Sequence, residues 1–526
     1  MPNLPLLSLK NLTVHFKNSD NNVIKNLSLT LHQGQTLGLA GASGSGKSLT
    51  ALALMGLLPA HSEQRGRIIF RGQDLTKNSP QQWQAIRGKH IGLVFQEPMT
   101  ALNPVRIIVK QIDESIRLHS SLNKIQRHEK IKQLLHQVQL DTSLSNRYPH
   151  QLSGGQKQRV VIAMAMACQP DILICDEPTT ALDVTTQKNL VVLLKQLQQT
   201  HGMAMLFISH DLAVMSQIAD HIAIMQKGTV VEQAETATLM QNPKTDYTRR
   251  LIAAAAPENT LSNKITGRKP PLVAIKNLQV RFKQKANGFK SPAYLHAVDD
   301  VTLKIKAGDV VGLVGESGSG KTTLGRCLVG LQDYTNGQIN IHGSPRNKHS
   351  HKSLQMIFQD PYASLNPRMT IQQSLSEPLD IHNLYRQPIK RQQRLNELLQ
   401  QVDLNSDMLS RLPHQFSGGQ RQRIAIARAL ACEPELLICD EAVTALDVLV
   451  QQQVVALLKR LVADTNLSLL FISHDIALVS SFANRLAVMQ QGRLVEQGET
   501  SKIMQQPQHS YTQQLISSIP RLATTA

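Results

Sequence analysis

Cysteine is scarce in this chain, and the spacing of the few cysteines excludes two kinds of stabilised fold. The 526 residues contain five cysteines, and no two of them form a CxxC pair. An odd count without paired spacing argues against a disulfide framework and against a zinc site. We expect small buried hydrophobic residues at these positions, which are Cys168, Cys175, Cys327, Cys432 and Cys439.

Long apolar runs are also missing. No uninterrupted run reaches the roughly 20 residues that a membrane-spanning helix needs. Residues 1–5 show no basic segment followed by an apolar core, so we expect no signal peptide. We therefore expect a cytoplasmic protein that contacts a membrane only through a partner.

Acidic residues are outnumbered by basic ones. The chain has 56 Lys and Arg against 38 Asp and Glu, which gives a formal net charge of +18. Such an excess suits nucleic acid, an anionic membrane surface or simply a solvated basic surface. The basic residues are scattered rather than gathered in one run, which keeps the last interpretation open.

Glycine, by contrast, is concentrated in two copies of a phosphate-binding motif. Residues 41–48 and 315–322 both match GxxxxGK[ST], follow a short apolar run of strand type and precede helix-forming residues. In such a P-loop the backbone N–H groups and the helix N-terminus bind phosphate, the lysine reaches the outer phosphates and the hydroxyl ligates Mg²⁺. The residues predicted to bind nucleotide here are Gly41, Ala42, Ser43, Gly44, Ser45, Gly46, Lys47, Ser48, Gly315, Glu316, Ser317, Gly318, Ser319, Gly320, Lys321 and Thr322.

The two motifs belong to a tandem repeat. Most matched residues of the two halves lie 264 positions apart, but the P-loop lysines lie 274 apart. The second half therefore has an insertion around residues 283–295 and a compensating deletion after its P-loop. We predict domains at 6–257 and 272–520, joined by a polar linker at 258–271 with proline at both ends. Each half alternates apolar strands with helical patterns, which is typical of an α/β domain with a largely parallel sheet.

Adjacent acids end an apolar strand in both halves, as Asp176-Glu177 and Asp440-Glu441. The first acid can hold Mg²⁺, and the second can orient or deprotonate a water molecule. A strand that ends in a surface turn does not explain two adjacent acids in both halves.

A glutamine and a histidine also follow strands at matched positions. Gln96 and Gln359 can ligate Mg²⁺, or they can simply begin a proline turn. His210 and His474 can contact a γ-phosphate, although a lone histidine is more often structural.

Aromatic residues precede each P-loop. Phe16 and Phe282 end strands, where they are either half-buried strand residues or platforms that stack on a nucleotide base.

The sequence SGGQ precedes a long helix in both halves. A serine cap followed by two glycines offers N–H groups and a hydroxyl to an anion, or it is ordinary helix capping. The residues are Ser153, Gly154, Gly155, Gln156, Ser417, Gly418, Gly419 and Gln420.

These motifs, in this order, resemble the ATP-binding domains of ABC transporters over nearly the whole chain, twice. The resemblance implies two tandem P-loop ATPase domains, each with a mostly parallel sheet core, an antiparallel β subdomain and a helical subdomain. It implies head-to-tail pairing, in which each ATP is held between one P-loop and the opposite SGGQ signature. It also implies catalytic carboxylates at Glu177 and Glu441 and switch histidines at His210 and His474. The implied Mg²⁺ ligands are Ser48, Gln96, Asp176, Thr322, Gln359 and Asp440.

A narrower resemblance is carried by the tails at residues 242–251 and 506–515 and by the SLNP-type turn after each glutamine. These features are similar to the oligopeptide/dipeptide branch of ABC importers, which includes nickel importers and fused ATPases for glutathione or microcin C. The branch implies two integral-membrane permease subunits, a substrate-binding protein, a peripheral place on the cytoplasmic face of the membrane and no nucleic acid. Some relatives carry an iron–sulfur segment after the tail; this tail has no cysteine, so we assign none.

Other functions remain open at this point. A nickel importer of the same branch is one alternative. A tandem ABC ATPase that acts on ribosomes is another; the basic charge favours it, and the short linker disfavours it. Tandem sugar importers commonly have one degraded site, whereas both sites are intact here, and DNA-repair ATPases carry zinc-type cysteines and long coiled coils.

Overall fold

A computed structural model describes residues 4–17, 22–180, 182–255, 270–283, 294–346, 352–444, 446–520 and 522. Of the predicted linker, only residues 270 and 271 fall in these ranges, and strand β11 already begins at Pro271. Most of the predicted insertion around residues 283–295 also lies outside them.

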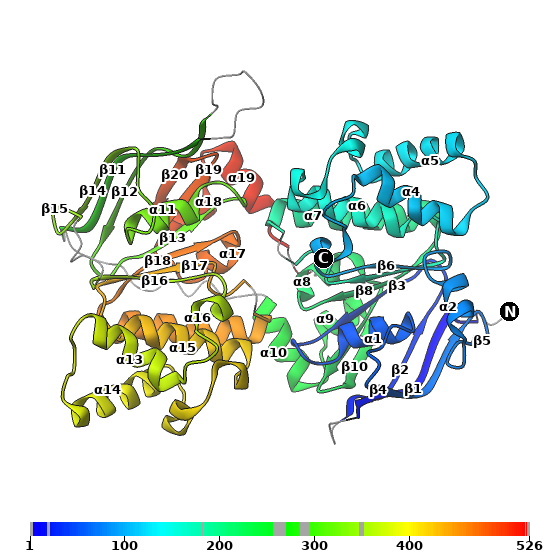
Figure 1. The fold of residues 1–526 in the computed structure, drawn as a ribbon, viewed down its shortest axis with the longest axis horizontal. Helices are drawn as coiled ribbons and strands as arrows, with labels where there is room; N and C mark the ends of the chain where they lie inside the picture. The colour runs from blue at the N-terminus through cyan, green and yellow to red at the C-terminus, as the bar shows by residue number, and fades with distance from the viewer. Residues whose placement is uncertain are drawn as a thin grey trace.

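Each half is built on a six-stranded sheet (Figure 1). The strand order is β10-β9-β3-β8-β7-β6 in the first half and β16-β17-β18-β13-β19-β20 in the second. Five strands are parallel, and β10 or β20 is the antiparallel edge. The strands are β3 (Thr36–Ala40), β6 (Ile91–Val94), β7 (Ile172–Asp176), β8 (Ala204–Ser209), β9 (His221–Gln226), β10 (Thr229–Glu235), β13 (Val310–Val314), β16 (Leu354–Ile357), β17 (Leu436–Asp440), β18 (Ser468–Ser473), β19 (Arg485–Gln490) and β20 (Arg493–Glu499).

A four-stranded antiparallel sheet accompanies each six-stranded one. Its order is β2-β1-β4-β5 in the first half and β12-β11-β14-β15 in the second. Leu12 and Ile24 of this sheet share one buried cluster with Leu39 and Ile174 of the parallel sheet, so the two sheets pack on a common core. The strands are β1 (Leu7–Phe16), β2 (Asn22–Leu31), β4 (Ser62–Phe70), β5 (Gln73–Asp74), β11 (Pro271–Lys283), β12 (Tyr294–Lys306), β14 (Asn336–Ile341) and β15 (Ser344–Pro345).

Helices form the remaining layer and a helical subdomain in each half. The first half has α1 (Lys47–Leu54), α2 (Pro80–Ile86), α3 (Pro98–Ala101), α4 (Ile108–His119), α5 (Lys124–Gln137), η1 (Thr142–Asn146), η2 (Pro149–Gln151), α6 (Gly154–Ala165), α7 (Val184–His201), α8 (Leu212–Ile218), α9 (Thr236–Gln241) and α10 (Asp246–Ala255). The second half has α11 (Lys321–Leu328), α12 (Pro361–Ser364), α13 (Ile371–Ile381), α14 (Pro388–Gln401), η4 (Ser406–Ser410), η5 (Pro413–Gln415), α15 (Gly418–Leu430), α16 (Val448–Thr465), α17 (Ile476–Ser480), α18 (Thr500–Gln505) and α19 (Ser510–Ser517). Parallel sheet, antiparallel sheet and helical subdomain are thus present in both halves, as predicted.

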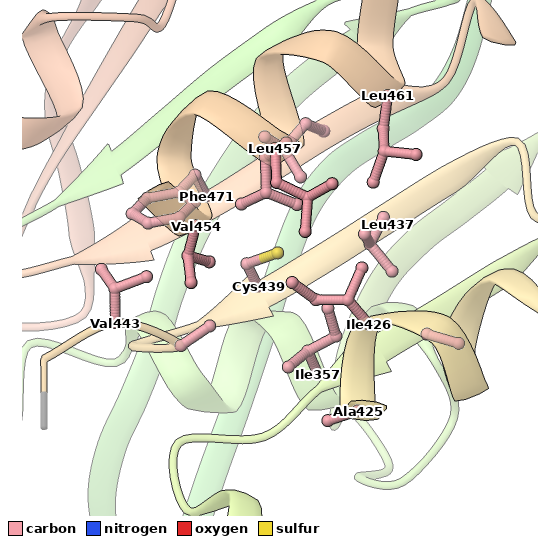
Figure 2. Close-up of a cluster of buried hydrophobic side chains, with 14 of the residues drawn as sticks. Ile357, Ala425, Ile426, Leu437, Cys439, Val443, Val454, Leu457, Leu461 and Phe471 are labelled. Carbon is pink, nitrogen blue, oxygen red and sulfur yellow. The ribbon is translucent and has the colours of Figure 1, made fainter. Parts of the chain in front are cut away.

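Strand β17 is packed on several sides by buried side chains of the second half (Figure 2). Cys439 lies among Ile426 of α15, Val454 of α16 and Phe471 of β18, and all four are fully buried. Replacing a large core side chain such as Phe471 by alanine typically costs about 3–5 kcal/mol. This packing holds the end of the strand, where Asp440 stands, in one place.

The prediction of buried cysteines is confirmed for four of the five. Cys175, Cys327, Cys432 and Cys439 are buried, whereas Cys168 is partly exposed. Burial raises the pKa of all five thiols, which favours their protonated form.

The two halves meet through their tail helices. Figure 1 shows α10 of the first half beside α16 of the second, and α19 of the second half beside α7 of the first. Gln452 Nε2 donates to the Ala254 carbonyl at 3.0 Å, and Lys188 Nζ donates to the Ser517 carbonyl at 2.9 Å. Across the described ranges, no helix is long and apolar enough to cross a bilayer.

Candidate nucleotide-binding sites

Glycine is required in both P-loops by close backbone approaches. A Cβ on Gly41 would lie 2.1 Å from the Met225 carbonyl oxygen, and Gly315 meets Met489 at the same distance. Gly46, which caps α1, has a φ of 102°, a left-handed conformation that favours glycine. The chain therefore turns tightly from β3 into α1 and from β13 into α11, in the strand–loop–helix context that the motif needs.

The P-loop lysines are buried, and each ammonium group bonds to carbonyl oxygens at the start of its own loop. Lys47 Nζ donates to the carbonyls of Gly41 at 2.8 Å and Ala42 at 3.0 Å. Lys321 Nζ makes the equivalent bonds to Gly315 and Glu316, each at 2.8 Å. Burial lowers the pKa of both lysines. The charges of the acid pairs at the ends of β7 and β17, Asp176-Glu177 and Asp440-Glu441, oppose this shift.

The first loop fits the phosphate chain of a nucleotide. Ser45 Oγ is buried and has no hydrogen-bond partner among the described residues. Gly44 borders open space, because a Cβ there would meet nothing within 4 Å. An unsatisfied hydroxyl and an open glycine turn beside a buried ammonium form a cradle suited to an anion.

One hydroxyl and one carboxylate meet behind each loop. Ser48 Oγ donates to Asp176 Oδ1 at 3.1 Å, and Thr322 Oγ1 donates to Asp440 Oδ1 at 2.9 Å. Burial raises the pKa of Asp176 to about 6 and raises that of Asp440 as well. Paired oxygen atoms of this kind fit Mg²⁺, which prefers oxygen ligands.

The second acid of the first half gathers several partners. Glu177 Oε2 accepts from Gln96 Nε2 at 3.1 Å and from Thr180 Oγ1 at 3.0 Å, and it lies 3.3 Å from His210 Nδ1. Lys47 Nζ lies 3.9 Å from Glu177 Oε1. The carboxylate is therefore surrounded by donors and positive charge.

These partners set the protonation of Glu177 and His210. Burial alone would raise the pKa of Glu177, but the hydrogen bond and charge of His210, the charge of Lys47 and the Thr180 hydroxyl together lower it. Burial alone would lower the pKa of His210, but Glu177 and Asp211 raise it. An ionised carboxylate beside a histidine can accept a proton from water.

The second half repeats this arrangement around Glu441 with fewer partners. Gln359 Nε2 donates to Glu441 Oε2 at 2.8 Å, and His474 Nδ1 lies 3.6 Å from Glu441 Oε1. Thr444 Oγ1 donates to the backbone carbonyl of Glu441 at 3.0 Å and not to its carboxylate. Burial would raise the pKa of Glu441, but His474 and Lys321 lower it.

Both glutamates also have an unusual backbone. Glu177 has a φ of 46° and Glu441 a φ of 47°, in the left-handed region that is unfavourable for a side chain of this kind. Such a conformation costs about 1–3 kcal/mol and is maintained only where the surrounding structure enforces it.

A cavity of about 740 Å³ joins the first P-loop to the second half. Its lining residues include Lys47, Glu177, Glu441 and Asp447. Asp447, which caps α16, thus faces the opposite P-loop.

The SGGQ residues cap helices α6 and α15 and do not line the described cavity. Ser153 Oγ and Ser417 Oγ accept from the backbone of Gln156 and Gln420 at 3.3 Å, so each serine caps its helix. Among the described residues that line the cavity there is no residue of either SGGQ segment.

The two predicted base platforms differ in position. Phe16 lines the cavity and stacks on His61, with ring centroids 5.2 Å apart. Phe282 lies on β11 with 38% of its surface exposed. The structure thus brings only Phe16 to the described cavity.

Sequence reasoning missed one pair of contacts at these sites. The backbone N–H of Ala42 donates to the hydroxyl of Tyr247 at 3.0 Å, and that of Glu316 donates to Tyr511 at 2.9 Å. The matched tails marked both tyrosines, but nothing in the local pattern pointed to the P-loop.

Two glycine loops, each with a buried lysine, an acid pair, a glutamine and a histidine, define an ABC-type ATPase. The chain belongs to this family: the family described as "ABC transporter" matches residues 24–180 and 298–444. The family described as "Oligopeptide/dipeptide transporter, C-terminal region" matches residues 231–284 and 495–526. The chain is therefore an ATP-binding ATPase subunit of a peptide-type ABC importer.

Individual relatives agree with this assignment. The chain is 40% identical to the glutathione import ATP-binding protein GsiA of Salmonella paratyphi A over an alignment of 555 positions. The alignment covers 97% of this chain and 88% of that protein. It is 40% identical to the protein of the same name from Shigella dysenteriae serotype 1, covering 98% and 89%.

Solved structures support the tandem fold. An archaeal ribosome recycling factor, solved with a ribosomal stalk protein, matches 93% of this chain and 90% of its own, with a TM-score of 0.63 and 21% identity. A structure described as RNase-L Inhibitor matches with a TM-score of 0.62 and 21% identity, again over 93% of this chain and 90% of its own. At this identity the likeness concerns the fold alone.

Proposed function

We propose that this ATPase drives import of di- or oligopeptides or peptide-like compounds, and that glutathione, a tripeptide, is the first cargo to test. The observation that carries the proposal is the oligopeptide/dipeptide C-terminal region in both halves. The relatives named as glutathione import proteins, at 40% identity over 97% of the chain, narrow the cargo class.

The partners in this proposal are two integral-membrane permease subunits and a substrate-binding protein, with the ATPase on the cytoplasmic face of the membrane. Large apolar side chains are exposed just after each glutamine, at Met99 (48%) and Val105 (79%) in the first half and Tyr362 (59%) in the second. Met99 and Tyr362 occupy matched places in the two halves, and exposed apolar residues there suit contacts with cytoplasmic loops of two similar permeases.

Each site binds one ATP in this proposal. The P-loop amides and Lys47 or Lys321 hold the phosphates, and Phe16 stacks on the base of the first nucleotide. Mg²⁺ would be held by Ser48, Asp176 and Gln96 in the first site and by Thr322, Asp440 and Gln359 in the second. Bound there, it would neutralise charge on the outer phosphates. The metal ligands are supported by the hydroxyl–carboxylate pairs behind both loops.

Hydrolysis is assigned to Glu177 and Glu441. Each carboxylate is kept ionised by its neighbours and therefore accepts a proton from the attacking water. His210 and His474, which follow β8 and β18, orient these carboxylates. Gln96 and Gln359 follow β6 and β16 and bond to the same carboxylates from the other side of β7 and β17.

Transport requires the two halves to close and reopen. In the proposed closed state, Ser417, Gly419 and Gln420 reach the nucleotide on Lys47, while Ser153, Gly155 and Gln156 reach the one on Lys321. Asp447 already faces the first P-loop across the cavity, which supports head-to-tail pairing within one chain.

A deletion strain tests the cargo. We expect loss of uptake of labelled glutathione or dipeptide with normal nickel uptake, and restoration by the wild-type gene but not by a Glu177→Gln, Glu441→Gln variant. The opposite pattern of uptake would refute the peptide assignment. Co-purification with ribosomes instead of permeases would refute the importer altogether.

A further inference from the structure

The second residue of each tail helix is a tyrosine that contacts the P-loop of its own half. Tyr247 and Tyr511 are 7% and 4% exposed, and their hydroxyl oxygens accept the amides of Ala42 and Glu316 at 3.0 and 2.9 Å. The phosphate loop and the tail are therefore joined directly, although they lie 205 and 195 residues apart in sequence.

The turn in front of each tail helix is held by a carboxylate. Glu232 accepts the backbone N–H groups of Lys244 at 2.8 Å and Thr245 at 3.0 Å. Glu496, its counterpart, accepts those of Gln508 at 3.0 Å and His509 at 3.1 Å. Two backbone bonds on one carboxylate fix where the helix starts and hence where its tyrosine points.

The far end of each tail helix touches the opposite half. Gln452 of α16 bonds to the Ala254 carbonyl, and Leu449 packs against the first-half core that contains Tyr247 and Leu251. Helix α16 begins at Asp447, which lines the cavity beside Lys47. Helix α10 thus connects the P-loop of its own half, through Tyr247, with helix α16 of the other half, whose first turn faces the same cavity.

We propose that Tyr247 and Tyr511 are positioning residues of the two nucleotide sites, each fixing the start of its P-loop from the tail helix. The inference rests on the proposed binding of ATP at these loops. Both phenols are neutral at physiological pH, because burial raises the pKa of Tyr247 and raises that of Tyr511 to about 12. Each hydroxyl bonds to a backbone amide of its loop, and neither tyrosine is among the described residues that line the cavity, so each acts through the loop.

This role makes a specific kinetic prediction. A P-loop binds the phosphates before and during hydrolysis, so loosening it removes binding that is uniform along the reaction, which raises KM and leaves kcat unchanged. Loss of one ordinary hydrogen bond corresponds to about a 3- to 10-fold change.

The test is the Tyr247→Phe, Tyr511→Phe double variant of the full chain. We expect KM for ATP and the Kd of ADP, measured by titration, to rise about 3- to 10-fold while kcat stays within about twofold. The matched control is Tyr385→Phe, which removes another tyrosine hydroxyl bond, to Glu433 in the helical subdomain. The control should lower the thermal midpoint at most and leave KM and Kd unchanged.

Four results separate the possibilities. An unchanged KM and Kd in the double variant would overturn the positioning role, as would a fall in kcat alone. An equal rise in Kd for Tyr385→Phe would also overturn it, because the effect would then be general loosening. Wild-type protein that binds no nucleotide would instead refute the proposed function, and the ADP titration on the wild type detects this separately.

Discussion

The two nucleotide sites share their main residues but differ in what surrounds the glutamate. In the first site Thr180 donates to the carboxylate of Glu177, whereas in the second Thr444 donates to the backbone of Glu441. Proline and threonine follow Glu177 where alanine and valine follow Glu441. The carboxylate that must react keeps glutamine and histidine partners in both sites, so these two contacts are the common requirement and the threonine contact is an addition.

The phosphate loops differ as well. Ala42 in the first loop is replaced by Glu316 in the second, whose pKa is raised by burial and by the charge of Asp183 from the first half. At this position, therefore, a carboxyl group stands in the second loop, near the opposite half, and none stands in the first. Two copies of one domain on a single chain have thus come to present different electrostatic surroundings to their nucleotides.

The largest expected effect is on hydrolysis. The Glu177→Gln, Glu441→Gln double variant should lose about 10²–10⁴-fold in ATPase rate, because it lacks both proposed general bases, while nucleotide binding persists. Each single variant, measured as steady-state ATPase, shows which site carries more of the turnover. A double variant that hydrolyses ATP at the wild-type rate would refute the assignment.

The next test concerns pairing of the sites. Ser43 is exposed and lines the cavity, so cysteines placed by Ser43→Cys and Ser417→Cys should crosslink within one monomer when ATP is bound to the Glu→Gln form. The background carries Cys168→Ser, because the other four native cysteines are buried. The control pair Ser43→Cys and Ser153→Cys, within one half, should not crosslink. Products that form only between separate chains would contradict intramolecular pairing.

A smaller effect is expected at the threonines. Thr180→Val, in a Glu441→Gln background, should lower kcat about 3- to 10-fold, because Glu177 loses a hydrogen bond. The loss also raises the pKa of Glu177, so the fall in activity on acidification moves to higher pH. Thr444→Val in a Glu177→Gln background is the matched control and should change kcat less than about twofold. Equal effects in both backgrounds would remove the distinction between the sites.

The smallest expected effect is on stability. The folded pKa of Asp176, about 6, lies above its value in an unfolded chain, so the ionised carboxylate destabilises the fold above pH 6, and this loss fades as pH falls through 6 toward 4. Asp176→Asn should therefore raise the thermal midpoint of nucleotide-free protein at pH 7.5 by at least about 2 °C. The gain should shrink at pH 5, and Mg²⁺-dependent nucleotide binding should weaken. A lower midpoint at pH 7.5 would contradict this account.

Much of the site follows from local sequence. An apolar run before GxxxxGK[ST] predicts a strand, a tight turn and a helix, and the backbone contact at Gly41 explains why glycine is required. An apolar strand ending at Asp176 places its acids at the carboxyl edge of a parallel sheet, beside the P-loop. These residues were predictable because short-range pattern and sheet geometry together determine their position.

Other contacts could not be read in this way. The bond between Tyr247 and Ala42, the carboxylate of Glu232 under the tail and the different partners of Thr180 and Thr444 depend on how distant segments dock. The left-handed backbone of Glu177 is likewise enforced by its surroundings and contradicts the residue's own preference. Matched positions in a repeat show that such residues have a role, but not which atoms they meet.

The contacts of α10 with α16 and of α19 with α7 have a consequence for how the two halves close and reopen during ATP hydrolysis. Within the part of the chain that the structure describes, the polar part of each is modest: one hydrogen bond from Gln452 and one from Lys188. Two separate subunits joined so weakly would drift apart at cellular dilution. Because both halves are on a single polypeptide, the effective concentration of one half near the other is on the order of millimolar, whatever the abundance of the protein. Weak contacts are then sufficient, and they leave the halves free to separate and rejoin on every turnover.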